Sequence, residues 1–190
     1  LTVLSGNPEK TEQEFKIKAI PRANLFKIIQ ALRNADLLVS GGGSLLQDVS
    51  SVFSLYYYLM IILLARVLGK KTVLYAQGIG PIKYKFNRLI TRIIINGVDL
   101  ITVRDQESKQ ELLNMGVSKQ PIHVTADSVY ALEVPKYAQK KKDEGDFLIG
   151  VSVRDWKNLY QYKQIIADSL DYIIAQQNAR VVFIPMYYPA

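Results

Sequence analysis

Short runs of apolar and β-branched residues alternate along the chain with longer stretches that carry apolar residues on one helical face. Runs of the first kind at residues 2–5, 17–20 and 37–40 predict strands. Between the last two, Leu25, Ile28 and Leu32 have helical spacing and follow Asn24, a typical helix-capping residue. This order predicts a β–α–β unit.

The same alternation continues to the end of the chain. It predicts helices over residues 52–69, 83–96, 106–115 and 159–177, and strands over residues 71–76, 99–103, 122–125, 147–153 and 180–184. Residues 135–146 are rich in lysine and acidic side chains and have little to bury. We therefore expect an α/β protein with two Rossmann-like domains, 1–134 and 147–190, joined by a linker at 135–146. On this interpretation the first domain lacks its opening β–α unit, and the second stops after one β–α–β unit.

Two of the predicted helices leave an alternative open. The helix over residues 52–69 has no charged residue before Arg66. This uncharged run is shorter than the roughly 20 apolar residues that a membrane span needs. We expect it in the core, although Tyr56, Tyr57 and Tyr58 also suit a face that touches a membrane. In the helix over 83–96 the pattern places four basic residues outward (Lys83, Lys85, Arg88, Arg92) and four apolar residues inward (Phe86, Leu89, Ile93, Ile94). Its basic face is either simply solvated or has a specific electrostatic role.

Composition narrows the classes of function only in part. The 190 residues are 49% hydrophobic and carry a formal net charge of +7, so a folded core and an anionic partner are both expected. Nucleic acid, a membrane surface and a phosphorylated metabolite all fit that charge. The absence of cysteine excludes disulfides, thiolate catalysis and cysteine-ligated metal. The single histidine, His123, lies within a predicted strand, where a core or surface residue is the better interpretation than a catalyst.

Both ends of the chain resemble interior sequence. The first residues have the pattern of a strand and a turn, without an initiator methionine or the charged and apolar regions of a signal peptide. The last residues follow directly on a predicted strand. We therefore expect either a fragment or the ordered part of a longer protein.

Two predicted strands run directly into glycine-rich turns. Residues 37–40 lead into three glycines, and residues 71–76 lead into Gln77-Gly78-Ile79-Gly80. Ligands of open parallel sheets bind beyond the carboxyl ends of the strands, where such turns meet. We predict a binding site that includes Gly42, Gly43, Ser44, Gln47, Gln77 and Gly78. Ser44 and Gln47 have the spacing of a capping box, so a helix beginning there would direct free N–H groups toward an anion. Alternatively, the glycines serve only a tight turn and the capping box is only structural.

A strand ending in Arg-Asp occurs in each predicted domain. Arg104 follows one such strand and Arg154 the other. Two domains facing across a cleft would bring both guanidinium groups to one phosphate or carboxylate, which their planar fork suits. Alternatively, each arginine pairs with a neighbouring aspartate. Asp127, at a third strand end, either binds a sugar hydroxyl or caps a turn.

Five motifs, spread over most of the chain, together resemble those of a known family. They are SGGGSLLQD at 40–48, YAQGIGPI at 75–82, TVRDQES at 102–108, VSVRDW at 151–156 and VFIPM at 182–186. They resemble the polysaccharide pyruvyl transferase family, in particular the bacterial type that acts in secondary cell-wall polysaccharide synthesis and S-layer anchoring. The resemblance implies a GT-B-like architecture with its active site between the domains. It also implies phosphoenolpyruvate as donor, a lipid-linked saccharide containing N-acetylmannosamine as acceptor, and a 4,6-pyruvyl ketal as product.

The resemblance further implies roles for particular residues. Arg104 matches an arginine that holds the anionic groups of the donor. The catalytic histidine of the family, in an Arg-Leu-His-like motif of the second domain, has no counterpart here and is expected beyond Ala190, so this chain alone is expected to be inactive. No metal, cofactor or nucleic acid is implied. We expect a cytoplasmic enzyme with peripheral contact at the inner face of the membrane. The alternatives are a GT-B nucleotide-sugar glycosyltransferase and a non-catalytic module that binds acidic glycan or membrane.

Overall fold

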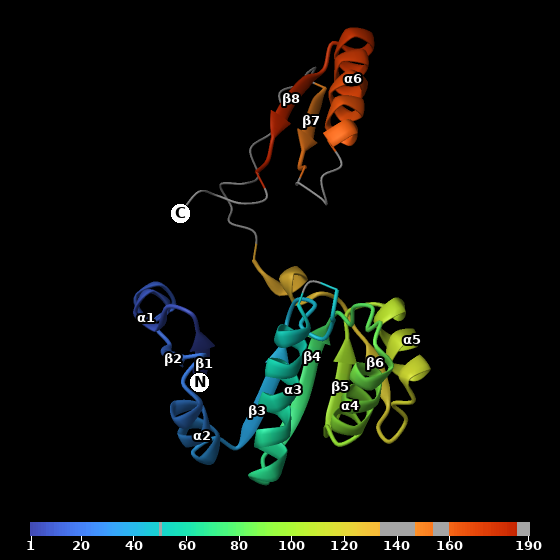
Figure 1. Ribbon diagram of the computed structural model, residues 1–190. Coiled ribbons are helices and arrows are strands. Elements are labelled where there is room, and N and C mark those ends of the chain that lie inside the picture. The colour runs from blue at the N-terminus through green and yellow to red at the C-terminus, as the bar shows by residue number, and fades with distance from the viewer. Residues whose placement is uncertain (50, 134–146, 154–159, 186–190) are drawn as a thin grey trace. The chain divides into compact units, whose positions relative to one another are not determined.

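Mixed helices and parallel sheets make up both parts of the protein. The computed structural model describes residues 1–49, 51–133, 147–153 and 160–185. The chain divides into two compact units, Leu1–Leu132 and Glu133–Ala190 (Figure 1). Every strand pairing in both units is parallel, as the alternation of strands and helices predicts. The linker predicted at 135–146 lies outside the described residues.

The first unit contains two parallel sheets. β1 (Thr2–Ser5) and β2 (Lys18–Pro21) form a two-stranded sheet, and the other four strands form a sheet in the order β3-β4-β5-β6. The strands of this larger sheet are β3 (Leu37–Gly41), β4 (Lys71–Gln77), β5 (Leu100–Val103) and β6 (Ile122–Val124). The helices of the unit are α1 (Pro8–Phe15), α2 (Leu25–Arg33), α3 (Val52–Val67), α4 (Lys85–Ile95) and α5 (Gln106–Met115), followed by the short 3-10 helix η1 (Ser128–Ala131).

Helix α1 was not predicted from the apolar pattern. It buries none of its residues, so no helical periodicity marks it. The sequence features that mark this helix lie at its N-terminus instead. The side chain of Asn7 accepts a hydrogen bond from the N–H of Lys10 at 3.1 Å, and Pro8 occupies the first turn, where its missing N–H costs nothing.

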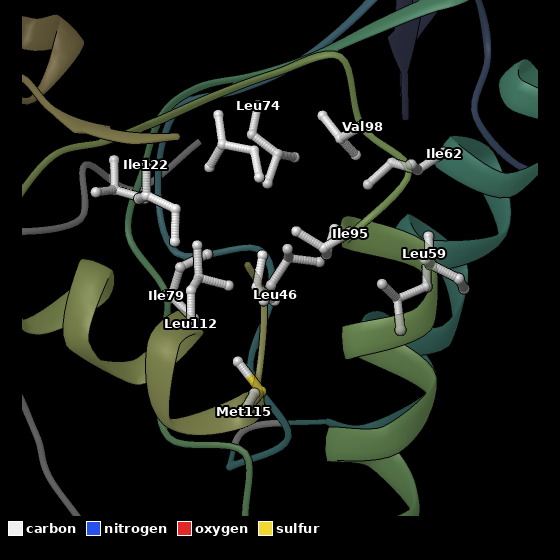
Figure 2. Close-up of a cluster of buried hydrophobic side chains, with 14 of the residues drawn as sticks. Leu46, Leu59, Ile62, Leu74, Ile79, Ile95, Val98, Leu112, Met115 and Ile122 are labelled. Atoms are coloured by element: carbon white, nitrogen blue, oxygen red, sulfur yellow. The ribbon is translucent and has the colours of Figure 1, made fainter. Parts of the chain in front are cut away.

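The main core lies between the four-stranded sheet and helices α3, α4 and α5, which cover the same face of that sheet (Figure 1). Along β5, and along β4 as far as Ala76, buried residues alternate with more exposed ones, as expected when one face of a sheet is covered. Figure 2 shows residues from all these elements converging, among them Leu59, Leu74, Ile95, Leu112 and Ile122. This core holds the four strands of the larger sheet in register.

A second, smaller core joins the early part of the chain to α3. Ile28 and Leu32 of α2 pack with Ile61 and Ala65 of α3, against partly buried side chains of β1 and β2. Helix α3 therefore has core contacts on two sides, which confirms its predicted place as a core helix. Within the described ranges, no helix combines the length and the apolar character needed to cross a membrane.

Helix α4 turns a different face inward from the predicted one. Its buried residues are Asn87, Thr91, Ile94 and Ile95. Phe86, Leu89 and Ile93, expected in the core, are exposed. Arg88, expected outside, is only partly exposed and pairs with Glu111 at 2.6 Å.

Polar contacts explain this rotation of α4. The side-chain amide of Asn87 donates to Asp48 at 2.9 Å and its oxygen accepts from the Tyr56 hydroxyl at 2.7 Å. A buried amide needs such partners, so Asn87 fixes which face of α4 turns inward. Hydrophobicity alone predicts the wrong face because it assigns Asn87 to solvent.

The described part of the second unit is one β–α–β element. It consists of β7 (Leu148–Val151), α6 (Tyr160–Gln177) and β8 (Arg180–Phe183), close to the predicted strand, helix and strand. The two strands pair in parallel, and the Ser152 hydroxyl donates to the carbonyl of Ile184 at 3.0 Å. Among the residues of this unit that the structure describes, only Ala179 has a buried side chain.

Candidate functional site

Four polypeptide segments meet at the carboxyl edge of the four-stranded sheet. Gly42 and Gly43 follow β3, Gly78 follows β4, Arg104 follows β5, and Asp127 lies beyond β6. The N–H of Gly78 donates to the carbonyl of Gly43 at 2.8 Å, which joins the two glycine turns directly. The parallel sheet therefore brings together residues that are up to 85 positions apart, Gly42 and Asp127.

A bulge in β4 sets the direction in which this strand ends. The pairing of β4 with β5 shifts between Leu74 and Gln77, and Ala76 adopts a left-handed conformation with φ of 47°. At the bulge, the Thr102 hydroxyl replaces the interrupted backbone hydrogen bonds between β4 and β5. It accepts from the N–H of Ala76 at 2.7 Å and donates to the carbonyl of Leu74 at 3.1 Å. Thr102 thus stabilises the turn that delivers Gly78 to the site.

Gly78 lies close to two polar side chains. A Cβ atom placed on Gly78 would lie 2.6 Å from the Cζ of Arg104 and 2.6 Å from the Oγ of Ser44. Both distances are shorter than real contacts allow. A larger residue here would therefore force the side chains of Arg104 and Ser44 to move from their present positions.

Arg104 is held at this edge by two carboxylates. Its Nε donates to Asp105 at 3.0 Å, and its Nη1 donates to Asp127 at 3.4 Å. The side chain remains 34% exposed. A guanidinium group has five N–H donors, so these two contacts orient the group and leave donors for a ligand.

Of the two carboxylates that contact Arg104, Asp105 also has a structural role in helix α5. It caps α5 by accepting the N–H of Ser108 at 2.7 Å. Partial burial raises the pKa of Asp105, but the hydrogen bonds from Ser108 and the charge of Arg104 outweigh this and lower it. The carboxylate is therefore ionised at neutral pH. Ser108 also accepts the N–H of Ile79 at 2.8 Å, which ties the β4 turn to α5.

The predicted helix start at Ser44 is wrong. Residues 44–48 form an extended loop in which Leu46 pairs with Ile79, and α3 begins only at Val52, capped by Ser51. Leu46 is fully buried, which holds this loop against the core. The N–H of Gly42 donates to the carbonyl of Tyr75 at 3.2 Å, so the expected row of free N–H groups at a helix end is not formed here.

Asp48 closes the far end of the same loop. Its buried carboxylate accepts the N–H groups of Lys83 and Tyr84 and the side-chain amide of Asn87. Burial raises the pKa of Asp48, but these hydrogen bonds and the charge of Lys83 lower it further than burial raises it. The negative charge also lies at the start of α4, where the helix dipole favours it.

The remaining predicted site residues lie in different surroundings. Gln77 is fully buried, and its amide donates to the Ser40 hydroxyl at 3.4 Å. It therefore links the ends of β4 and β3 inside the protein and is not available to a ligand at the surface. The Cβ of Gln47 fills the space beside Gly80. His123 is exposed on β6. Arg154 lies outside the described residues.

Three residues near the site were missed by sequence reasoning. Asp48 and Ser108 make the buried hydrogen bonds that hold the two glycine turns, and Ser128 lies 3.9 Å from the position of a Cβ on Gly42. The signals for Asp48 and Ser108 were their positions at the ends of the motifs at 40–48 and 102–108. No group of three histidine or acidic residues that could hold a metal ion occurs within the described ranges.

The fold and this edge define an α/β protein whose loops meet at the carboxyl ends of a parallel sheet, where ligands of such proteins bind. A family model described as polysaccharide pyruvyl transferase matches residues 1–189. The chain therefore belongs to the polysaccharide pyruvyl transferase family. This confirms the family that its five motifs indicate. A search of curated proteins and a search of solved structures each gave no match.

Proposed function

We propose that this protein transfers a pyruvyl group from phosphoenolpyruvate to a lipid-linked cell-wall saccharide containing N-acetylmannosamine, and that the product is a 4,6-pyruvyl ketal. Family membership supports the transfer of pyruvyl to a polysaccharide. The observation that carries the finer proposal is Arg104, a partly exposed guanidinium at the edge where two glycine turns meet. Phosphoenolpyruvate offers the phosphate and carboxylate groups that such a fork binds.

The reaction makes two demands on the site. The methylene carbon of the donor gains a proton and becomes a methyl group. The neighbouring carbon forms bonds to two sugar oxygens, and its bond to the phosphate oxygen breaks. Of the two hydroxyl protons released, one balances the proton gained by the methylene carbon and one leaves with phosphate. The site must therefore supply acid/base groups and stabilise a leaving anion.

In this proposal Arg104 is a donor-binding residue. Gly42, Gly43 and Gly78 let the donor approach the backbone, and Ser44 lies beside Gly78 as a hydroxyl partner. Asp127 is proposed to exchange its 3.4 Å contact with Arg104 for the acceptor hydroxyls when both substrates are bound. Arg154 is proposed as a second clamp from a GT-B-like partner domain, and the catalytic histidine as a residue of that domain. A lipid-linked acceptor would bring the enzyme to the inner face of the cell membrane.

The test is Arg104→Ala in the intact protein, assayed for release of phosphate from phosphoenolpyruvate in the presence of acceptor. We expect a loss of at least about 100-fold in kcat/KM, because a charged clamp on the leaving group is removed. Arg33→Ala, an exposed arginine at the end of α2, is the matched control and should retain activity.

Two results would contradict the proposal. Near-normal turnover by the Arg104→Ala protein, with an unchanged melting temperature, would remove Arg104 from the donor site. Thermal protection by UDP-sugars and none by phosphoenolpyruvate would favour a nucleotide-sugar glycosyltransferase instead.

A further inference from the structure

The net positive charge of this protein comes from one segment that lacks acidic residues. Residues 49–98 contain no aspartate or glutamate but contain seven basic residues, Arg66, Lys70, Lys71, Lys83, Lys85, Arg88 and Arg92. This segment therefore carries the whole formal net charge of +7, and the rest of the chain is balanced. It includes helices α3 and α4, which lie on the same side of the sheet (Figure 1).

The outward faces of these two helices are apolar. On α4, Phe86, Leu89 and Ile93 lie at helical spacing on one side, and Phe86 and Ile93 are 64% and 60% exposed. On α3, Phe53, Leu63 and Val67 are exposed on the side away from the core, Phe53 at 86%. The hydroxyl of Tyr56 on α3 donates to Asn87 on α4, so the helices are directly joined.

Basic side chains lie beside this apolar surface. Lys83 and Lys85 are exposed at the start of α4, and Arg92 is exposed two turns further along. Among the described residues, no carboxylate forms an ion pair with Lys85 or Arg92. We name the six apolar side chains above, with Lys83, Lys85 and Arg92, the basic apolar face.

We infer that the basic apolar face docks the protein on the surface of a membrane that contains anionic lipids. Exposed aromatic and aliphatic side chains beside lysine and arginine are the composition of surfaces that lie in the membrane interface. This inference rests on the proposed function, because a lipid-linked acceptor lies at a membrane and an enzyme that uses it must reach that membrane.

A second copy of the chain is a poorer occupant of this face. In a twofold dimer each surface meets its own copy, so two faces that lack any acidic residue would be brought together. The repulsion of like charges opposes such a contact, whereas anionic headgroups neutralise the charge.

The test measures sedimentation of the intact protein with vesicles of phosphatidylcholine alone and of phosphatidylcholine mixed with phosphatidylglycerol. We expect binding only to the mixed vesicles, weakened by salt. Lys83→Glu combined with Lys85→Glu should reduce that binding at least about tenfold. Phe86→Ser combined with Ile93→Ser should reduce it by about tenfold, because less apolar surface enters the interface.

The matched control replaces exposed residues on a different helix. Phe26→Ser combined with Lys27→Glu on α2 changes one aromatic residue, 78% exposed in the native protein, and one charge. It should bind vesicles like the native protein. Equal binding by all variants, no binding by the native protein, or equal binding to neutral vesicles would overturn the inference. So would conversion of a dimer to a monomer by Phe86→Ser and Ile93→Ser, seen by light scattering.

Failure of this inference is separable from failure of the proposed function. Pyruvyl transfer to a water-soluble fragment of the acceptor should be unchanged in both face variants. Transfer without vesicle binding would refute only the docking surface, and vesicle binding without transfer would refute only the proposed reaction.

Discussion

Gly78 and Arg104 depend on each other at the level of single side chains. The guanidinium group of Arg104 and the hydroxyl of Ser44 both occupy the space that a Cβ on Gly78 would need. A glycine turn at the end of a strand is visible in the sequence, and so is the arginine at the end of the next strand. Their contact is not, because it arises only from the pairing of β4 with β5 and from the bulge in β4.

Replacing Gly78 with alanine should displace both neighbours. If the proposed donor site is right, Gly78→Ala should lower kcat/KM for phosphoenolpyruvate by at least about tenfold, because misplaced binding groups lose much of their effect. Steady-state kinetics measures this directly.

Gly69→Ala is the control for this change. Gly69 has a positive φ of 70°, and no atom lies within 4 Å of the position of its Cβ. Its replacement should cost roughly 1–2 kcal/mol of stability from backbone strain and leave the kinetics unchanged. Unaltered kinetics in Gly78→Ala would mean that the position of Arg104 does not matter for turnover.

At the level of elements, apolar periodicity predicted most strands and helices within a few residues. It failed where polar contacts decide the outcome. The inward face of α4 is set by Asn87 and Asp48, and the loop after Gly43 is set by Leu46 pairing with Ile79. Neither partner can be recognised from spacing, because the two members of each pair are more than 30 residues apart in the sequence.

The bulge in β4 offers a test at this level. Thr102→Val keeps the shape of the side chain but removes the hydroxyl that serves Ala76 and Leu74. We expect a loss of about 1–3 kcal/mol in the free energy of unfolding, since the N–H of Ala76 loses its partner. Urea denaturation measures it. Thr102→Ser retains the hydroxyl and should lose clearly less. Equal losses in both variants would assign the effect to packing.

The anchoring of α4 by Asp48 should depend on pH. The folded protein holds the pKa of this carboxyl below the ordinary 3.8, so its stabilising effect is complete above that value and is lost as the pH falls through the lower folded pKa. We expect Asp48→Asn to cost about 1–3 kcal/mol at neutral pH.

Urea denaturation at neutral and acidic pH distinguishes the two proteins. The difference between native protein and Asp48→Asn should shrink as the pH falls below 3.8. A difference that is constant across this range would show that the charge of Asp48 does not contribute.

At the scale of the whole molecule, the two units differ in how much they bury. The first has a core of 16 buried apolar residues, whereas in the described part of the second only Ala179 is buried. The alternating pattern predicted strands and helices equally well in both. It could not predict this difference, because periodicity shows which face is apolar and does not show whether anything covers it.

This difference predicts unequal stability in isolation. Residues 1–132 produced alone should unfold in a single cooperative thermal transition, since they contain both apolar cores. Residues 133–190 alone should lose helicity gradually, because one β–α–β element buries too little to offset its conformational entropy. Circular dichroism follows both. A sharp transition in the shorter segment would contradict the expectation.

The two carboxylates around Arg104 restrict which ions compete for it. A guanidinium that is already paired with two carboxylates gains little from chloride or another monovalent ion, because exchanging Asp127 for such an ion adds no negative charge. Only a ligand with greater negative charge and paired oxygen atoms gains from replacing it. Such a centre would remain vacant in ordinary salt and would respond chiefly to multiply charged metabolites.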